Sequence, residues 1–212
     1  EVYNFWQDET NVRGLWRKTS LESYASDSPD WETIVDFDQL AEDEGKNWVY
    51  KGANCFSAEG NDRWACMVSL SNGGKDATED REFDLSTKTW VEDGFFIPEA
   101  KSSITWVDYD TLLVATDWGA DGSTLTESGY PYVVKRLKRG QPFEEAVEVY
   151  SGEKDDVGVF PMAMELQDGT RLSGVVVADT FFTSRYFLLP GNGELPLQLP
   201  IPAKSSPVDV LG

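Results

Sequence analysis

The segment NWVYKGANCF, which starts at Asn47, has two counterparts, SSITWVDYDT from Ser102 and VGVFPMAMEL from Val157. These segments begin 55 residues apart each time. Each is rich in apolar residues, and further strand-like segments follow it before the next one begins. A period of about 50 residues with four strands in each unit is typical of a β-propeller. The sequence therefore predicts an all-β fold built from blades, which is a scaffold rather than a function.

The segments that follow each first strand keep the same order. A second apolar run comes first, then a more polar strand and then a short closing strand. In chain order the three sets are RWACMVSL, REFDLST and TWVED; DTLLVATD, YVVKRLKRG and EAVEVY; and RLSGVVVAD, SRYFLLPGNG and LPLQLPI. The opening segment supplies only two such pieces, GLWRKTSLESY from Gly14 and DWETIVDF from Asp30.

These repeats predict a single partial β-propeller domain over residues 1–212, with about three and a half four-stranded antiparallel blades. The expected bounds are a half-blade at 1–45 and blades at about 46–98, 99–152 and 153–202. A closed propeller has roughly four to eight blades, so we expect a piece of a larger ring. An open stack exposes apolar sheet faces at both ends, which predicts that the isolated chain self-associates, most simply as a two-fold dimer.

Helix signals are scarce. The best one is VDFDQLAEDEG, which predicts a short helical turn capped by Asp38 and ending at Gly45. Gly, Asn, Asp and Pro mark hairpin turns elsewhere. The tail IPAKSSPVDVLG either starts a further blade or is a frayed end.

The chain is strongly acidic, with 38 Asp and Glu against 18 Lys and Arg and a formal net charge of −20. Phosphate backbones are repelled by such a charge, so we expect no nucleic-acid partner. We also expect no membrane partner, because there is no apolar run of about 18 residues. The acidic residues either attract a basic ligand or form an ordinary solvated surface. It leaves the compartment open between the cytoplasm and the periplasm.

Cys55 and Cys66 flank a predicted hairpin loop. They are compatible with a disulfide across the hairpin in an oxidising compartment. They are equally compatible with two buried free thiols. A zinc site is not expected, because the chain has no histidine and no CxxC pair.

Other chemistry finds little support in the sequence. Close acidic groups such as Asp8 with Glu9, and Asp36 with Asp38, resemble glycosidase pairs only in their residue types. The loop from Asp117 to Gly122 departs from a calcium-binding loop at its third position and at its closing acid. The many aromatic residues stand at strand positions, where packing between blades explains them. We therefore expect no metal and no cofactor.

The blocks that carry the repeat resemble the propeller of bacterial prolyl oligopeptidases, and the likeness covers nearly the whole chain. In order along the chain, they are Tyr3–Asp8, Arg13–Arg17, Pro29–Trp31, Asn47–Val49, Arg81–Leu85, Phe95–Ser102, Leu125–Pro131 and Phe181–Ser184.

Members of that family are serine peptidases that cut short peptides after proline. The resemblance implies a seven-bladed propeller that caps an α/β-hydrolase peptidase domain and acts as a size filter. This chain departs from the family in lacking any Gly-x-Ser-x-Gly elbow and any histidine. Ser-His-Asp chemistry needs the imidazole to move the serine proton, so we expect the chain alone to be catalytically inactive.

Loops that enter the first strand of each blade are expected to form one face of the ring. These are Pro98 to Ser102 and Glu153 to Asp156, with Ala203 to Ser206 as a third if another blade begins there. The resemblance implies that this face looks toward the peptidase domain. Possible chamber-facing residues are then Glu99, Lys101, Asp155 and Asp156; alternatively these are solvated connector residues.

Two functions remain open from the sequence. The first is a non-catalytic part of a prolyl oligopeptidase-like serine endopeptidase, whose partners are the peptidase domain and short peptide substrates. The second is a stand-alone acidic propeller-like binding or scaffold protein. The gene beyond Gly212 separates them, because only the first predicts a downstream Gly-x-Ser-x-Gly motif and a late histidine.

Overall fold

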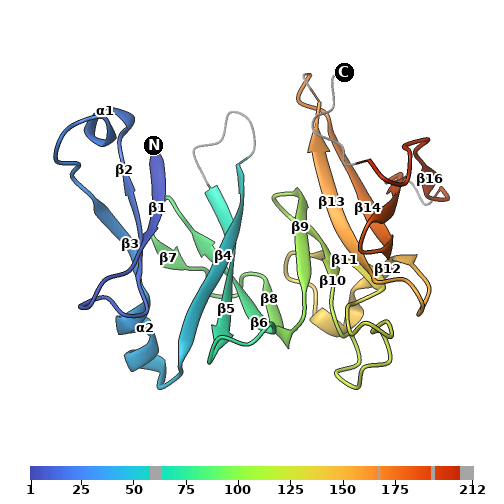
Figure 1. Ribbon diagram of the computed structural model, residues 1–212, viewed down its shortest axis with the longest axis horizontal. Coiled ribbons are helices and arrows are strands. Elements are labelled where there is room, and N and C mark those ends of the chain that lie inside the picture. Colours follow the sequence, from blue (N-terminus) through green and yellow to red (C-terminus); the bar gives the residue numbers. More distant parts are fainter. Residues whose placement is uncertain (58–63, 167, 192–193, 206–212) are drawn as a thin grey trace.

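The chain forms four antiparallel β-sheets that stand side by side in sequence order, as Figure 1 shows from left to right. This computed structural model describes residues 1–57, 64–166, 168–191 and 194–205. The sheets pack face to face, as the blades of a propeller do. The prediction of an all-β partial propeller is confirmed.

The first sheet has three strands, one more than the sequence indicated. Its order is β1 (Val2–Trp6), β2 (Leu15–Thr19) and β3 (Glu32–Asp36). The short helix α1 (Leu21–Tyr24) lies between β2 and β3, and α2 (Phe37–Glu44) connects β3 to the second sheet. The strand β1 was missed because its segment has no matching counterpart in the repeat.

The second sheet contains five strands in place of the expected four. They are β4 (Trp48–Ser57), β5 (Trp64–Asn72), β6 (Thr78–Asp84), β7 (Thr89–Trp90) and β8 (Phe96–Ala100). Both β7 and β8 pair with β6, one at each end of it. They are therefore two halves of one interrupted outer strand. The expected loop from Pro98 to Ser102 is correspondingly shorter, since its first half belongs to β8.

The third and fourth sheets keep the four-stranded pattern, and in both the chain runs from the first strand outward. The third consists of β9 (Ser103–Asp108), β10 (Thr111–Ala115), β11 (Val133–Lys138) and β12 (Val147–Ser151), with a 3-10 turn at Phe143–Glu145. The fourth consists of β13 (Gly158–Glu165), β14 (Arg171–Thr180), β15 (Thr183–Leu188) and β16 (Leu197–Gln198).

Each junction between neighbouring sheets has its own apolar core. Aromatic residues such as Trp16, Phe37 and Trp48 dominate the first core. The second core is built around Trp106, and the third is mainly valine and leucine. Burial of both sheet faces explains why a central strand such as β10 is buried along its whole length and, after Thr111, apolar at every position instead of alternating.

The first strands of three sheets, β4, β9 and β13, lie next to one another. Side chains connect them to neighbouring backbones. Asn54 Nδ2 donates to Ile104 O at 2.8 Å, and Trp106 Nε1 donates to Asn54 O at 2.9 Å. Arg171 Nε donates to Trp106 O at 3.1 Å. Asn54 and Trp106 thus join β4 to β9, whereas Arg171 joins β14, the second strand of the fourth sheet, to β9. Together with the packing of β13 against β9, these bonds make the first strands one wall.

The N-terminal cap of α2 differs from the prediction made from the sequence. The cap is Asp36, whose carboxylate accepts from the backbone N–H groups of Asp38 and Gln39. Asp38, the predicted cap, instead accepts from the backbone N–H of Arg13. The helix ends as expected at Gly45, which has a φ of 62°. Either aspartate satisfies the cap pattern, and only the contact with the β1–β2 turn distinguishes them.

The tail stays on the fourth sheet as far as it is described. Ser184 N donates to Ala203 O at 2.8 Å, and the Tyr186 hydroxyl donates to Ser205 O at 3.0 Å. Ala203 and Ser205 therefore lie along β15. Ser206, the last residue of the third predicted loop, lies outside the described residues.

Candidate functional site

Two loops that lead into first strands lie on the same edge of the stack, which we call the entry edge. One is Lys101–Ser102, before β9, and the other is Glu153–Asp156, before β13. The turn that contains Tyr130 connects them. Lys101 Nζ lies 5.0 Å from the centre of the Tyr130 ring, and Glu127 N donates to Lys154 O at 2.9 Å. The third sheet thus supplies the middle of this edge.

The four charged residues singled out in the sequence differ in their surroundings. Glu99 pairs with Lys75 at 3.0 Å, and Lys101 lies 3.8 Å from Asp76. Asp155 is exposed. Asp156, in contrast, is buried, and Arg185 contacts its carboxylate at 3.2 Å. Its other oxygen accepts from Glu153 N at 2.8 Å, so Asp156 shapes the loop from within.

A hollow of about 460 Å³ opens beside Glu99 and Lys101 at the entry edge. Trp118 and Phe143 stack in its wall with their ring centres 4.7 Å apart. Trp118 Nε1 donates to Val133 O at 3.0 Å, which fixes the indole in place. The sequence alone places Trp118 only in the loop from Asp117 to Gly122, because its stacking partner Phe143 is 25 residues away.

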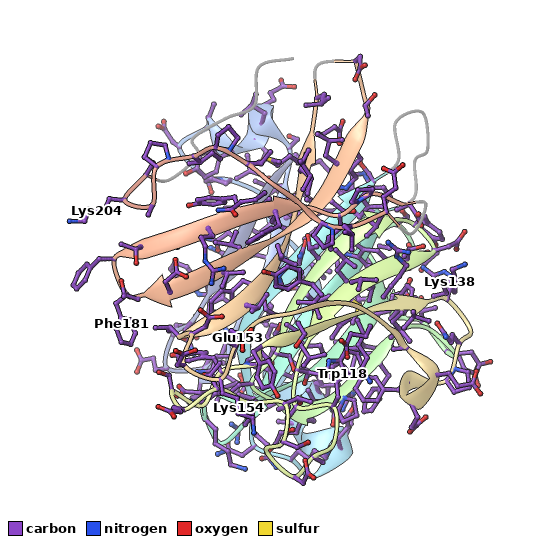
Figure 2. The ribbon with its side chains drawn as sticks, turned by 90° about the vertical axis from the view of Figure 1, so that its right-hand side faces the viewer. Trp118, Lys138, Glu153, Lys154, Phe181 and Lys204 are labelled. Carbon is purple, nitrogen blue, oxygen red and sulfur yellow. A yellow bond between two sulfur atoms is a disulfide. The ribbon has the colours of Figure 1, made fainter. Side chains whose placement is uncertain are left out.

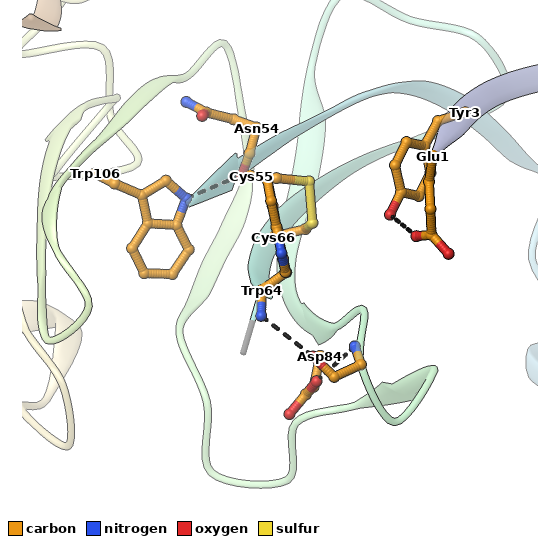
Figure 3. Close-up of a disulfide and its surroundings, with 9 residues drawn as sticks. Glu1, Tyr3, Asn54, Cys55, Trp64, Cys66, Asp84 and Trp106 are labelled. Atoms are coloured by element: carbon orange, nitrogen blue, oxygen red, sulfur yellow. Dashed lines mark hydrogen bonds between the residues drawn. A yellow bond between two sulfur atoms is a disulfide. The ribbon is translucent and has the colours of Figure 1, made fainter. Parts of the chain in front are cut away.

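A second hollow, of about 330 Å³, lies between the first and second sheets, near the disulfide in Figure 3. Its wall is aromatic, with Tyr3, Phe5, Trp16, Tyr50 and Trp64 among its lining residues. Burial raises the pKa of Tyr50 to about 12. Burial, together with the hydrogen bond to Glu1, raises the pKa of Tyr3 to about 12. Both phenols are therefore neutral at physiological pH, and they add no charge to this hollow.

Cys55 and Cys66 form a disulfide in this structure. The two residues stand directly opposite each other on β4 and β5. Cys66 is fully buried, whereas Cys55 lines the aromatic hollow. The sequence had left both states open, since the cysteines' spacing does not by itself fix the register of the hairpin.

The carboxylates of Asp8, Asp117 and Asp121 stabilise turns of the backbone. Hydrogen bonds, first from Asn11 N and then from Trp6 Nε1, lower the pKa of Asp8 to about 2. Asp117 accepts from Gly122 N at 2.9 Å, and Asp121 accepts from Ser123 N at 2.9 Å, which makes the calcium-like loop a tight turn. Within the described residues, no three His, Cys, Asp or Glu side chains are grouped to hold a metal ion. Among the helices described, none is long and apolar enough to cross a membrane.

The fold is that of a partial propeller, whose sheets pack face to face and whose first strands lie next to one another. The model of the prolyl oligopeptidase N-terminal β-propeller domain matches residues 1–195. The chain therefore belongs to this family, and the resemblance drawn from the sequence is confirmed.

Two curated relatives are called uncharacterized peptidases. One, y4nA from Sinorhizobium fredii, is 49% identical over 156 residues, which is 74% of this chain and 21% of the relative. The other, RP174 from Rickettsia prowazekii, is 36% identical over 167 residues, or 74% of this chain and 22% of the relative. The chain thus spans about a fifth of the length of the curated relatives it matches.

Solved structures show the same architecture. A post-proline cleaving enzyme from Rickettsia typhi matches with a TM-score of 0.84 and 28% identity, covering 95% of this chain and 30% of the other. Oligopeptidase B from Leishmania major matches with a TM-score of 0.65 and 14% identity, covering 95% of this chain and 26% of the other. The second likeness concerns the fold alone.

Proposed function

We propose that this chain is the non-catalytic propeller part of a prolyl oligopeptidase-like serine endopeptidase, where it limits the access of large substrates. The observation that carries the proposal is the wall formed by β4, β9 and β13. Asn54 and Trp106 join β4 to β9, β13 packs against β9, and Arg171 on β14 donates to the backbone of β9. A wall of this kind excludes a folded domain by shape, whereas a short flexible peptide passes along it. The family match and the peptidase relatives support this reading.

The catalytic chemistry must come from outside these residues, because the chain contains no histidine. Ser-His-Asp catalysis needs an imidazole to take the serine proton and to deliver it to the leaving amine. The purified chain is expected to leave a proline-containing chromogenic peptide intact. Turnover that co-purifies with the chain and survives a check for contaminating serine proteases contradicts this expectation.

The filter is tested in the full-length peptidase that carries this chain. Its substrates are a short proline-containing peptide and the same sequence placed in an exposed loop of a folded protein. We expect cleavage of the peptide only. The variant Asn54→Ala with Arg171→Met removes one side-chain bond between β4 and β9 and one between β14 and β9. It is expected to raise cleavage of intermediate-length peptides selectively. Equal cleavage of the free and the folded sequence by the wild type disproves the filter.

Self-association of the isolated chain remains our prediction. The face of the fourth sheet turned away from the third carries Met162, Leu172 and Val176, which alternate with inward-facing residues such as Val175. Covering such a face returns about 25 cal/mol per Å², which offsets part of the entropy lost on association. Sedimentation equilibrium at micromolar concentration is the measurement. A species of 23.7 kDa throughout rules the dimer out.

A further inference from the structure

The turn between β14 and β15 presents two adjacent phenylalanines to solvent. Phe181 is 77% exposed and Phe182 is 85% exposed. The turn beneath them is well defined, because the hydroxyls of Thr180 and Thr183 form a hydrogen bond of 2.7 Å. Phe182 N also donates to Thr180 Oγ1 at 3.1 Å. We call residues 180–183 the Phe tip. It is a shaped apolar projection (Figure 2).

The Phe tip belongs to the entry edge. Arg185 connects the two, since its Nε donates to Asp179 at 2.6 Å and its Nη2 contacts Asp156 at 3.2 Å. The backbone adds a second connection, from Val157 N to Ala178 O at 2.8 Å. The tip is therefore fastened to the loop that leads into β13.

Charged residues lie on the loop beside the apolar tip. Glu153, Lys154 and Asp155 on the neighbouring loop are all exposed, and Figure 2 shows Glu153 and Lys154 on the same side of the molecule as Phe181. An apolar centre with a polar rim is the usual anatomy of a protein–protein interface. Aromatic side chains at such a centre typically provide much of the binding energy.

The position of the tip selects its partner. A further blade would pack on the free face of the fourth sheet, which carries Met162 and Val176, whereas the Phe tip projects from the end of the strands. Most of each curated relative lies outside the matched region, since the chain covers only 21% and 22% of them. The proposed function requires a peptidase part outside these residues, and the resemblance drawn from the sequence implies that the entry edge looks toward it.

We propose that the Phe tip is an anchor that inserts Phe181 and Phe182 into an apolar pocket on the peptidase part of the same protein. This inference rests on the proposed function. The anchor holds the propeller wall at a defined position over the peptidase part, while the charged rim keeps the contact specific.

The test uses the full-length peptidase with the photoreactive residue p-benzoylphenylalanine in place of Phe181. This residue keeps an aromatic ring at the tip. After irradiation, mass spectrometry is expected to find Phe181 joined to the peptidase part. A crosslink to another part of the propeller, or no crosslink at all, overturns the inference.

The matched control carries the same photoreactive residue in place of Leu21, which is 70% exposed on α1. The helix α2 leads into the first strand β4 and therefore lies at the entry edge, whereas α1 joins β2 to β3 at the opposite edge. The photoreactive residue on α1 is therefore expected to give no crosslink to the peptidase part. The size selectivity of the unmodified full-length peptidase is measured in parallel. Selectivity without the expected crosslink refutes the anchor alone, whereas loss of selectivity refutes the proposed filter.

Discussion

The junction between the first and second sheets differs sharply from the junction between the second and third. In the second junction Trp106 is fully buried and donates a hydrogen bond across to β4. In the first junction Tyr3 and Phe5 remain partly exposed around a hollow of about 330 Å³. The two junctions have similar aromatic content. What differs is the strand opposite β4, because β9 packs directly against it, whereas β1 leaves the aromatic hollow between them.

The second junction also contains a buried ion pair. Arg139 Nη1 lies 2.7 Å from Glu82 Oε2, and the Glu82 side chain has no exposed surface. Arg139 also donates to Tyr109 O at 2.6 Å and lies 4.7 Å from the centre of the Phe95 ring. Among the described residues, Glu82 Oε1 has no hydrogen-bond partner. The junction therefore depends on Arg139 to compensate a carboxylate that is removed from water.

The largest effect is expected from Arg139→Met, which leaves the Glu82 charge buried without its partner. The free energy of unfolding should fall by about 3–5 kcal/mol. Urea denaturation of the purified chain measures it. The control is Arg136→Met, which replaces an arginine on β11 in the same way. It should lower the free energy of unfolding by less than about 1 kcal/mol. Similar losses in both variants contradict the special role of Arg139.

A smaller effect is expected when alanine is enlarged in each junction. Ala65 is buried in the second core, so Ala65→Leu should destabilise the fold by about 1–3 kcal/mol through overpacking. Ala53 lines the aromatic hollow, where a leucine has room, so Ala53→Leu should change the stability by less than about 1 kcal/mol. Thermal unfolding of the two variants measures these changes. If Ala65→Leu and Ala53→Leu lower the stability equally, the proposed difference in packing between the two junctions is wrong.

The smallest effect concerns Glu44, which joins α2 to the second sheet. Hydrogen bonds from Arg81, at 2.7 and 2.9 Å, are the main reason that the pKa of Glu44 is lowered. A carboxylate with a lowered folded-state pKa contributes stability above its ordinary pKa, and this contribution disappears as the pH falls through the folded value. Glu44→Gln should cost up to about 1 kcal/mol at pH 7, since the pair is partly solvated. The loss should vanish in acid.

The pKa of Asp80, on β6 of the second sheet, is shifted in the opposite direction to that of Glu44. Burial is the main reason that the pKa of Asp80 is raised. Folding therefore favours its protonated form, and the stability it contributes at low pH disappears as the pH rises through the folded value. The difference between Asp80→Asn and the wild type should accordingly grow in favour of the variant with rising pH. The same trend for Glu44→Gln and Asp80→Asn in pH-dependent urea titrations contradicts one of the two assignments, and the direction of that trend shows which one.

Local patterns were enough to locate most strands. The three repeated segments start at Asn47, Ser102 and Val157, and β4, β9 and β13 each begin one residue later. Alternation and hairpin turns are local properties, so a single sequence shows them. The interrupted outer strand of the second sheet was not predictable, because β8 is recognised only by its pairing with β6.

Among the site residues too, the sequence showed local features but not contacts between distant segments. Glu99, Lys101 and Asp155 were identified as charges near the loops into first strands, and all three are at least partly exposed at the entry edge. Asp156 could not be separated from Asp155 by sequence, because its partner Arg185 is 29 residues away. The stacking of Trp118 on Phe143 was hidden for the same reason.

The sequence by itself determined the blade repeat, the family and the absence of the histidine that serine peptidase chemistry needs. These features are written in residue types and in regular spacing along the chain. Only the tertiary structure decided that Cys55 and Cys66 form a bond, that Asp156 is buried, and that the Phe tip lies on the entry edge. Each of these depends on which distant residues the packed sheets bring together, and pairing between strands depends on partners that no local pattern specifies.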